Sequence, residues 1–271
     1  MKPILILVAS IVILSLLGWM GLQVKPASFP TFSQPTSELK TIPLPKGLPT
    51  PVERFYREVY GENIPVIESA VISGQGTMRI NGITLPVRFR FTHEAGKDYR
   101  HYFEATLFGI PLLKVNEGYL DGESFFESPM GSYYNEQNAN QGANLTLWAE
   151  AIWFPSLWVT DTRARWEPVD KYTALLYVPY GEREENFIVR FNPQTGLIDM
   201  MEAMRYRDLG QGSPKILWIV RNEISQADAG ADNHLTGSVM WLDQGKPWAY
   251  FNLEELVFNA DVSAYIRERD Q

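Results

Sequence analysis

An uninterrupted apolar stretch at the N-terminus restricts the fold of this chain more than any other feature of its sequence. The 21 residues from Ile4 to Val24 carry no charged side chain. As a helix they would span about 31 Å, the thickness of a hydrocarbon core. Signal peptides have a shorter apolar region that ends in small residues, whereas this one ends in "GWMGLQVKP". We therefore expect residues 1–24 to be an uncleaved transmembrane anchor, with a cleaved signal peptide and a buried core helix as the alternatives.

The flanks of the apolar stretch contain little information about its orientation in a membrane. Lys2 lies before it and Lys25 after it, so the basic residues are nearly balanced. Domains that follow a single N-terminal anchor are commonly exported. We expect a single-pass membrane protein that contacts the bilayer through residues 4–24 and holds its domain outside the cytoplasm.

The remainder of the chain has the composition of a folded domain. Apolar residues make up 45% of the 271 residues, which is enough to bury a core. The net charge is −8 and no dense run of lysine and arginine occurs, which argues against a nucleic-acid partner. The chain has no cysteine, which excludes disulfides, thiolate metal sites and a cysteine nucleophile.

Proline dominates the segment between the anchor and the domain. Residues 25–51 contain seven prolines, which remove backbone donors and restrict their neighbours, so neither a helix nor a central strand is expected there. We interpret residues 25–50 as an extended, semi-rigid spacer. Irregular coil packed on the domain is the alternative for its second half.

A short helix is expected where the spacer ends. Thr50 has the side chain of an N-cap, Pro51 suits the first turn, and Glu53 lies three residues after Thr50. Apolar residues then recur at helical spacing until Gly61. The pattern predicts a helix over residues 51–60.

Alternation of apolar and polar residues dominates the chain from residue 83 onward, and it is typical of strands with one buried face. The residues expected to face inward are Val87, Phe89, Phe91, Tyr99, His101, Phe103, Ala105, Leu107, Tyr172, Ala174, Leu176, Val178, Phe187, Val189, Phe191, Ile216, Trp218 and Val220. Turn signals such as "NG", "EAGKD", "DGE" and "NPQTG" separate the runs. The pattern predicts a mainly β, α+β domain over residues 51–271, built on a single curved antiparallel sheet or half-barrel.

One helix interrupts this series of strands. In "NEQNANQGANLTLWAEAIWF", Leu147, Ala151 and Phe154 share a helical face, and Pro155 ends the element. We expect this inserted helix near residues 142–154, with several strands before it and several after it. It would cover the concave face of the sheet.

The stretch "WAEAIWFPSLWVTDTRARW" concentrates aromatic side chains at this helix, because it holds four of the eight tryptophans. Aromatic walls with a few polar groups are typical of ligand pockets. The candidate ligand-binding residues are Trp148, Glu150, Trp153, Trp158, Arg163, Arg165 and Trp166. The alternative is that the indoles are core packing, and the five-residue spacing of Trp148 and Trp153 favours it.

Glu150 borders the apolar face of the inserted helix. A buried carboxylate acquires either an ion-pair partner or a raised pKa. We expect Glu150 to pair with Arg163 or Arg165, or to face solvent. A role as a general acid is the alternative.

Two histidines flank the turn "EAGKDYR". If the loop is residues 96–98, His93 and His101 lie opposite each other across a hairpin and form a metal-ligand set with Glu94. Hairpin histidines without an ion are far commoner, so we predict no metal and no cofactor. A hydrolase-type enzyme that uses Glu150 or His93 and His101 stays open as an alternative.

Catalytic and nucleotide-binding motifs are absent from the sequence. It contains no G-x-S-x-G, no phosphate-binding loop and no dinucleotide fingerprint. The glycine-rich "SGQGTM" at 73–78 leads into a strand and predicts a bulge or bend. We therefore assign no catalytic residue.

Five segments of the chain carry a family resemblance: "LPTPVERFYREVYG", "GTMRI", "AEAIWFPSLW", "RWEPVD" and "RFNPQTGLIDMMEAMRYRD", which extend over most of residues 48–207. They resemble a bacterial and archaeal family of domains of unknown function. The segment "QADAGADNHLTGSVMW" departs from the family pattern, in which a glycine-marked hairpin with a proline precedes the last strands. The resemblance implies a strand-helix-strand order like that of the curved sheets of periplasmic lipoprotein carriers, and it implies no activity.

These features together predict a membrane-anchored, non-enzymatic module whose curved sheet binds an apolar or amphiphilic, lipid-like ligand or an envelope partner. A hydrolase-type enzyme and a structural envelope protein are the alternatives. An apolar, open concavity under residues 145–158 would favour the binding module. A polar cleft that joins Glu150 to His93 or His101 would favour the enzyme, and a solid, fully packed sheet the structural protein.

Overall fold

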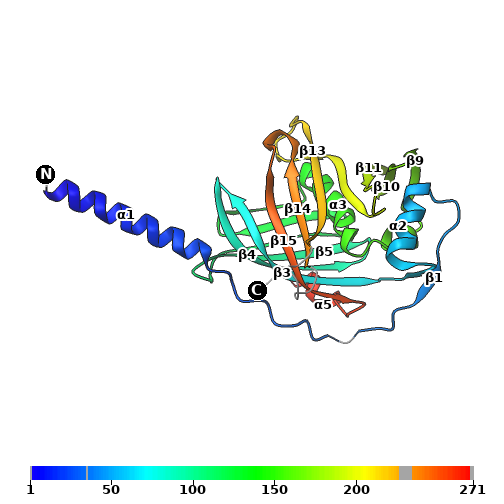
Figure 1. The fold of residues 1–271 in the computed structure, drawn as a ribbon, viewed down its shortest axis with the longest axis horizontal. Helices are drawn as coiled ribbons and strands as arrows, with labels where there is room; N and C mark the ends of the chain where they lie inside the picture. The colour runs from blue at the N-terminus through cyan, green and yellow to red at the C-terminus, as the bar shows by residue number, and fades with distance from the viewer. Residues whose placement is uncertain (1, 35, 226–233, 269–271) are drawn as a thin grey trace.

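An N-terminal helix and a β domain make up the computed structural model, which describes residues 2–34, 36–225 and 234–268 (Figure 1). Helix α1 (Lys2–Gln23) projects away from the domain, and its apolar side chains are exposed along its length. It is long and apolar enough to cross a membrane. Residues 226–233, part of the segment that departs from the family pattern, lie outside the described residues.

Thirteen antiparallel strands form one curved sheet. The strands before the inserted helix are β3 (Ser69–Ile80), β4 (Ile83–Glu94), β5 (Asp98–Leu107), β6 (Ile110–Leu120), β7 (Glu123–Ser128) and β8 (Gly131–Tyr134). Those after it are β9 (Arg165–Asp170), β10 (Thr173–Tyr180), β11 (Arg183–Phe191), β12 (Ile198–Tyr206), β13 (Lys215–Ser225), β14 (His234–Trp241) and β15 (Pro247–Phe258). The predicted α+β fold with a single antiparallel sheet is confirmed.

The two halves of the sheet meet where its first and last strands pair. The strand order is β8-β7-β6-β5-β4-β3-β15-β14-β13-β12-β11-β10-β9. The chain therefore runs outward from β3 to the edge strand β8, crosses to the opposite edge at β9, and returns inward to β15. Among the described strands of this sheet, every pair except β3–β15 joins neighbours in the sequence. The segment that crosses between the edges has to span the concave face.

Alternation along the strands directs one face of the sheet into a common core. Phe89, Leu176 and Phe187, all expected to face inward, are fully buried. Cross-strand pairing places Phe89 beside Phe103, so large side chains from adjacent strands lie in one layer. The core fills the space between this layer and the inserted segment.

Two glycines in β3 let β3 and β15, the pair of strands that closes the sheet, approach each other closely. A Cβ at Gly76 would lie 1.9 Å from the carbonyl oxygen of Tyr250, and one at Gly74 would lie 2.0 Å from that of Asn252. The register shifts between residues 253 and 255, opposite Gly74. The bulge predicted from "SGQGTM" is therefore present, but its extra residue is in β15 rather than in β3.

Helix α2 (Thr50–Tyr60) forms where the sequence predicts it, and it buries Phe55 and Tyr56 against the core. The prediction that Thr50 is the N-cap was wrong. Pro49 holds that position, and no side chain caps the helix. The prolines at 49 and 51 fix φ near helical values, so the helix starts one residue earlier than the capping pattern implies.

The first half of the proline-rich spacer lies along the outer face of β4. Arg88 donates a hydrogen bond to the carbonyl oxygen of Ala27 at 3.1 Å, and Arg90 donates one to that of Pro30. The guanidinium of Arg88 also lies 4.4 Å from the ring centre of Phe29. These contacts hold this part of the spacer against the sheet.

Smaller elements complete the domain. In the second half of the spacer, β1 (Thr41–Pro43) pairs with β2 (Asn63–Pro65), so that half packs on the domain through a short strand and not only as irregular coil. A short turn, η2 (Leu242–Gln244), lies between β14 and β15, and α5 (Ser263–Arg267) packs beside β4 and β5.

The inserted segment is longer than predicted. Helix α3 (Gln137–Ala149) continues into the turn η1 (Glu150–Trp153), and α4 (Leu157–Thr160) follows Pro155. The predicted range of 142–154 missed the first turns because residues 137–141 are polar and lack apolar periodicity. Gln141 is nevertheless buried, and its amide donates to Glu185 and to the carbonyl oxygen of Met204, both at 3.0 Å.

Candidate functional site

The inserted segment lies inside the curve of the sheet, where most of its side chains are buried (Figure 1). Trp148 and Trp158 are 1% and 0% exposed, and the indole N–H of Trp158 donates to the carbonyl oxygen of Trp148 at 3.0 Å. Trp166 is half-buried and packs edge-on against Trp158, with ring centres 6.0 Å apart. These three tryptophans pack with the hydrophobic core around the turn at Pro155.

An open groove of about 610 Å³ lies beside the inserted segment. Its apolar lining is Phe55, Val59, Tyr60, Ile152, Trp153, Pro155, Leu197, Ile198 and Leu235. Its polar lining is Asn192, Thr195, Asp199 and Asn222. This volume and this mixture of aromatic, aliphatic and a few polar side chains are those of small-molecule sites. Trp153 is the member of the tryptophan block that lines the groove.

Arg163 and Arg165 pair with carboxylates at the surface. Arg163 contacts Asp161 at 2.5 Å, and Arg165 contacts Glu184 at 2.8 Å. Both arginine side chains are about half exposed. The predicted pairing of Glu150 with one of these arginines was wrong, because a different set of side chains surrounds Glu150.

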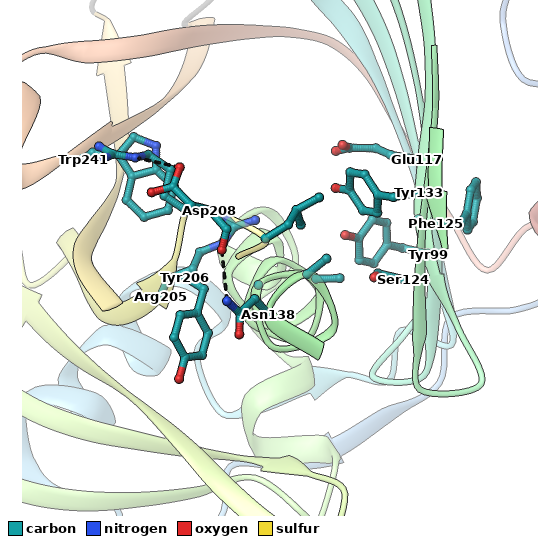
Figure 2. Close-up of a pocket in the computed structure, with 16 residues that line it drawn as sticks. Tyr99, Glu117, Ser124, Phe125, Tyr133, Asn138, Arg205, Tyr206, Asp208 and Trp241 are labelled. Carbon is teal, nitrogen blue, oxygen red and sulfur yellow. Dashed lines mark hydrogen bonds and ion pairs between the residues drawn. The ribbon is translucent and has the colours of Figure 1, made fainter. Parts of the chain in front are cut away.

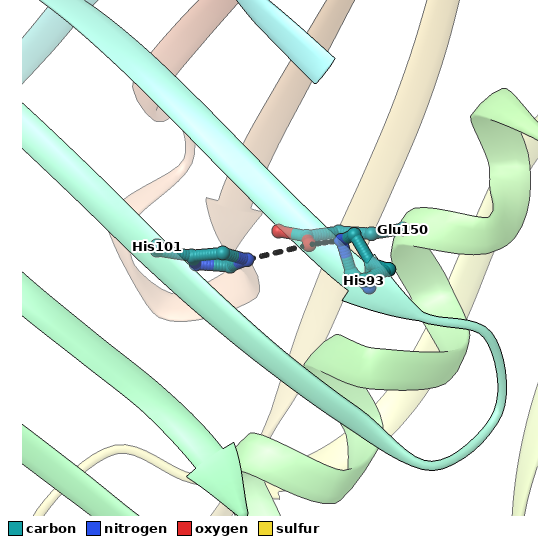
Figure 3. Close-up of side chains that lie close together, drawn as sticks. All are labelled: His93, His101 and Glu150. Atoms are coloured by element: carbon teal, nitrogen blue, oxygen red, sulfur yellow. Dashed lines mark hydrogen bonds and ion pairs between the residues drawn. The ribbon is translucent and has the colours of Figure 1, made fainter. Parts of the chain in front are cut away.

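Glu150 meets both histidines of the β4–β5 hairpin (Figure 3). Its Oε2 lies 2.7 Å from Nε2 of His101 and 2.9 Å from Nε2 of His93. The donor atoms of the three residues all lie within 4.8 Å of one another. Both imidazoles are buried, whereas the side chain of Glu150 keeps 14% of its exposure. The structure thus joins the three residues that the enzyme hypothesis named.

The hairpin pairs its residues differently from the prediction. Its loop is residues 95–97, so His93 lies opposite Tyr99 and His101 lies opposite Phe91. Because the offset between the two histidines is two residues, they are diagonal neighbours on the same face of the sheet. The prediction that they lie directly opposite each other was wrong.

Glu94 does not join the histidines. It follows His93 in β4 and therefore points to the other face of the sheet. There its carboxylate contacts Lys97 at 2.9 Å and Arg267 at 3.4 Å. Glu94 therefore does not complete the ligand set that the sequence offered as an alternative, and Glu150 occupies the corresponding place.

Burial and mutual charge set the protonation of this cluster. Burial lowers the pKa of His101, but the carboxylates of Glu150 and Glu117 outweigh it and raise that pKa to about 9. Burial raises the pKa of Glu150, and the two histidines outweigh it and lower that pKa to about 2. Burial also lowers the pKa of His93, which Glu150 offsets only in part. At neutral pH the cluster is an ion pair of His101 and Glu150 beside a neutral His93.

Aromatic side chains and a second carboxylate surround the cluster. The ring centre of Phe91 lies 4.0 Å from that of His101, and the ring centre of Phe154 lies 5.4 Å from that of His93. Nδ1 of His101 lies 3.3 Å from Oε1 of Glu117. The histidines therefore sit in an enclosed polar cluster and not in an open cleft.

A second hollow, of about 100 Å³, is also lined by Glu117. Figure 2 shows Glu117, Tyr99 and Tyr133 on the strands that face Arg205 across this hollow. Nε of Arg205 is buried and has no hydrogen-bond partner among the described residues. A Cβ at Gly142 of α3 would lie 3.0 Å from that Nε, so the glycine leaves room for the guanidinium. The guanidinium of Arg205, which has an N–H without a partner, thus lines the same hollow as Glu117, the carboxylate that contacts His101.

Sequence reasoning missed Glu117 and Arg205, although a signal for both was present. Arg205 follows Met201 and Ala203 at two-residue steps, and both of those residues are buried. Glu117 likewise precedes the buried Tyr119 by two residues. A charged side chain at an inward position of an alternating strand is rare, and this pattern would have identified them. No periodicity indicated that α2 would line the groove.

Two solved structures are similar to this chain at low sequence identity. A LolA superfamily protein from Nitrosomonas europaea has a TM-score of 0.45 at 10% identity, covering 81% of this chain and 96% of that chain. A DUF1329 family protein from Desulfovibrio piger has a TM-score of 0.43 at 11% identity, covering 82% of this chain and 98% of that chain. No curated protein matches the sequence. Residues 38–253 match the family of unknown function DUF6544, and since this is most of the chain, the protein belongs to that family.

Proposed function

We propose that this protein is a membrane-attached, non-enzymatic module that holds an apolar or amphiphilic, lipid-like molecule in the groove beside its inserted segment. The observation that carries the proposal is the lining of that groove, whose volume is about 610 Å³. Helix α2 and residues 152–155 supply aromatic and aliphatic walls, and Asn192 and Asp199 supply polar groups that can orient a headgroup. The domain lies outside the cytoplasm, as a single N-terminal anchor predicts.

The groove is built on side chains that are already fixed. The ring of Phe55 packs 5.9 Å from that of Phe191, and the ring of Trp153 packs 6.0 Å from that of Phe91. A ligand that meets fixed walls loses less affinity to the ordering of side chains. Val59 is 41% exposed and leaves apolar surface open at the groove.

An apolar turn beside the end of α1 supports membrane attachment. The β5–β6 turn exposes Phe108 (47%), and the first residues of β6 expose Ile110 (68%) and Leu112 (63%). The backbone N–H of Phe108 donates to the carbonyl oxygen of Gly21, near the C-terminal end of α1, at 2.9 Å. If α1 fills the hydrocarbon core, these side chains lie at the bilayer surface, where exposed apolar groups are stabilised. The helix and the turn together hold the domain against the membrane.

A photoactivatable fatty acid tests the groove in the full-length protein reconstituted in nanodiscs. We expect crosslinks in residues 52–60 and 152–155, located by mass spectrometry of peptides. Val59→Glu should abolish them, because it places a charge on the apolar wall. Val169→Glu is the matched control, since Val169 is a valine of β9 that is 55% exposed and does not line the groove. Crosslinks confined to α1, or crosslinks that persist in Val59→Glu, would contradict the proposal.

A further inference from the structure

We propose that His93, His101 and Glu150 form a binding site for a divalent transition-metal ion of the Zn²⁺ type. Two imidazoles and one carboxylate are the donor set of zinc sites that keep a fourth position open. Imidazole nitrogen favours zinc, copper, iron and nickel over magnesium and calcium, which prefer oxygen. The site shares no residue with the lining of the groove, so it stands independently of the proposed function.

The distances from the two imidazoles to the carboxylate are close to those around one ion, and all three ligand atoms lie within 4.8 Å of one another. Nε2 of His101 and Nε2 of His93 lie 2.7 and 2.9 Å from Oε2 of Glu150. A tetrahedral ion with bonds of about 2.0–2.2 Å holds its ligand atoms about 3.3 Å apart. Each imidazole therefore has to withdraw from the carboxylate by only about half an ångström, a change that small side-chain rotations supply.

His93 provides independent evidence for a missing ligand. Its imidazole is 0% exposed, its Nδ1 has no hydrogen-bond partner within the described chain, and its Nε2 is in contact with Glu150 alone. Its closest polar neighbour is the carboxylate of Glu150, whose Oε2 lies 2.9 Å from Nε2. Buried polar atoms nearly always have a partner. An ion bound by Nε2 of His93 and Oε2 of Glu150 would give this buried imidazole a ligand to hold.

Glu117 has the position of an outer-shell carboxylate. Its Oε1 lies 3.3 Å from Nδ1 of His101, the ring nitrogen that faces away from Glu150. Metal-ligating histidines usually donate their second N–H to such a carboxylate, which fixes the tautomer and the direction of the ring. The contact therefore holds Nε2 of His101 toward the site.

The site is held by rigid elements. His93 and His101 project from the adjacent strands β4 and β5, and Glu150 projects from the end of α3, where the helix tightens into η1 (Figure 3). Glu150 also borders a hollow of about 30 Å³. A single water needs about 10–15 Å³, so the hollow can hold a water beside Glu150, although neither histidine lines it.

Equilibrium dialysis against Zn²⁺ tests the site in the full-length protein in nanodiscs, after metal is removed with a chelator. We expect a single Zn²⁺ per chain, and loss of that ion in His93→Gln, His101→Gln and Glu150→Gln. Glu117→Gln should weaken binding by about 10- to 100-fold. Glu94→Gln is the matched control: it changes a carboxylate next to His93 that faces the other side of the sheet, and it should bind like the wild type. Absence of bound zinc, or zinc retained by all three ligand variants, overturns the proposal.

Spectroscopy of the metal-loaded wild type tests the same site without any substitution, so it applies even where a ligand variant does not fold. X-ray absorption at the zinc edge of the loaded wild type should show two imidazole ligands. Co²⁺ in place of Zn²⁺ should give the visible absorption bands of a tetrahedral ion. A coordination shell of oxygen alone would show an ion bound elsewhere, and an octahedral Co²⁺ spectrum would contradict a tetrahedral site; either result would overturn the assignment.

Discussion

Nε2 of His101 lies 2.7 Å from Oε2 of Glu150, although 49 residues separate them in the sequence. This contact joins the β4–β5 hairpin to the end of α3 inside the concave face. Both groups are largely buried, so removing one of them leaves the charge of the other with a single neighbour, Glu117 for His101 and His93 for Glu150. The ion pair therefore makes the packing of the inserted segment depend on pH.

We expect the metal-free protein, held in excess chelator, to lose stability as the pH rises from 6.5 to about 9. The pKa of His101 is raised from 6.5 to about 9 in the folded state, so its contribution is complete below pH 6.5 and is lost as the pH rises through the folded pKa. The pKa of Glu150 is lowered from 4.5 to about 2, so its contribution is present above pH 4.5 and is lost as the pH falls toward 2. Thermal unfolding across the pH range measures both limits.

His101→Gln is the control for this pH dependence. Glutamine keeps a hydrogen-bonding side chain but does not titrate, so the fall in melting temperature between pH 6.5 and 9 should be smaller in the variant. Equal slopes for variant and wild type would show that other groups produce the effect.

Replacement by phenylalanine should destabilise the protein more at Trp158 than at Trp153, because only the indole of Trp158 makes a hydrogen bond. Trp158→Phe removes the donor to the carbonyl oxygen of Trp148, whereas the indole N–H of Trp153 has no partner among the described residues. We expect Trp158→Phe to lower the free energy of unfolding by about 1–2 kcal/mol more than Trp153→Phe does. Urea unfolding of the two variants measures the difference, and equal losses would contradict this account.

The sheet could be predicted from the sequence because its signal is local. Val87, Phe89 and Phe91 alternate with arginines, and such runs specify strands and their inner face without any distant contact. The pairing of β3 with β15 has no such signal, since it joins the two ends of the domain. The order of the strands therefore became clear only from the structure.

The hairpin register shows why the cluster was not predicted. Asp98 is buried and accepts hydrogen bonds from the backbone of Asp121 at 2.8 Å and from Arg267 at 2.9 Å. These distant contacts place Asp98 in the strand, and they shorten the loop to residues 95–97. Sequence spacing around the turn contains no information about Asp121 or Arg267, so it could not indicate which face each histidine shares with Glu150.

Gly76→Ala should destabilise the closing strand pair. The new methyl group would lie 1.9 Å from the carbonyl oxygen of Tyr250, and backbone atoms on both strands would have to move apart. Overpacking of this kind costs about 3 kcal/mol. Gly210→Ala is the control, because its methyl group would meet only the hydroxyl of Ser213, at 3.3 Å. Chemical unfolding of both variants tests the prediction, which a Gly76→Ala protein as stable as the control would contradict.

Phe29→Ala should release the first half of the spacer from the sheet while leaving the domain folded. The ring of Phe29 lies 4.4 Å from the guanidinium of Arg88 and 5.1 Å from that of Arg90. Cation–π contacts at partly exposed sites contribute about 0.5–1 kcal/mol each, so losing two should raise the rate of proteolytic cleavage within residues 26–34 by about tenfold. The melting temperature of the domain should change little. Leu39→Ala, at a residue of the same spacer that is 45% exposed, should cleave at the wild-type rate, and equal rates for the two variants would show that Phe29 does not hold the spacer.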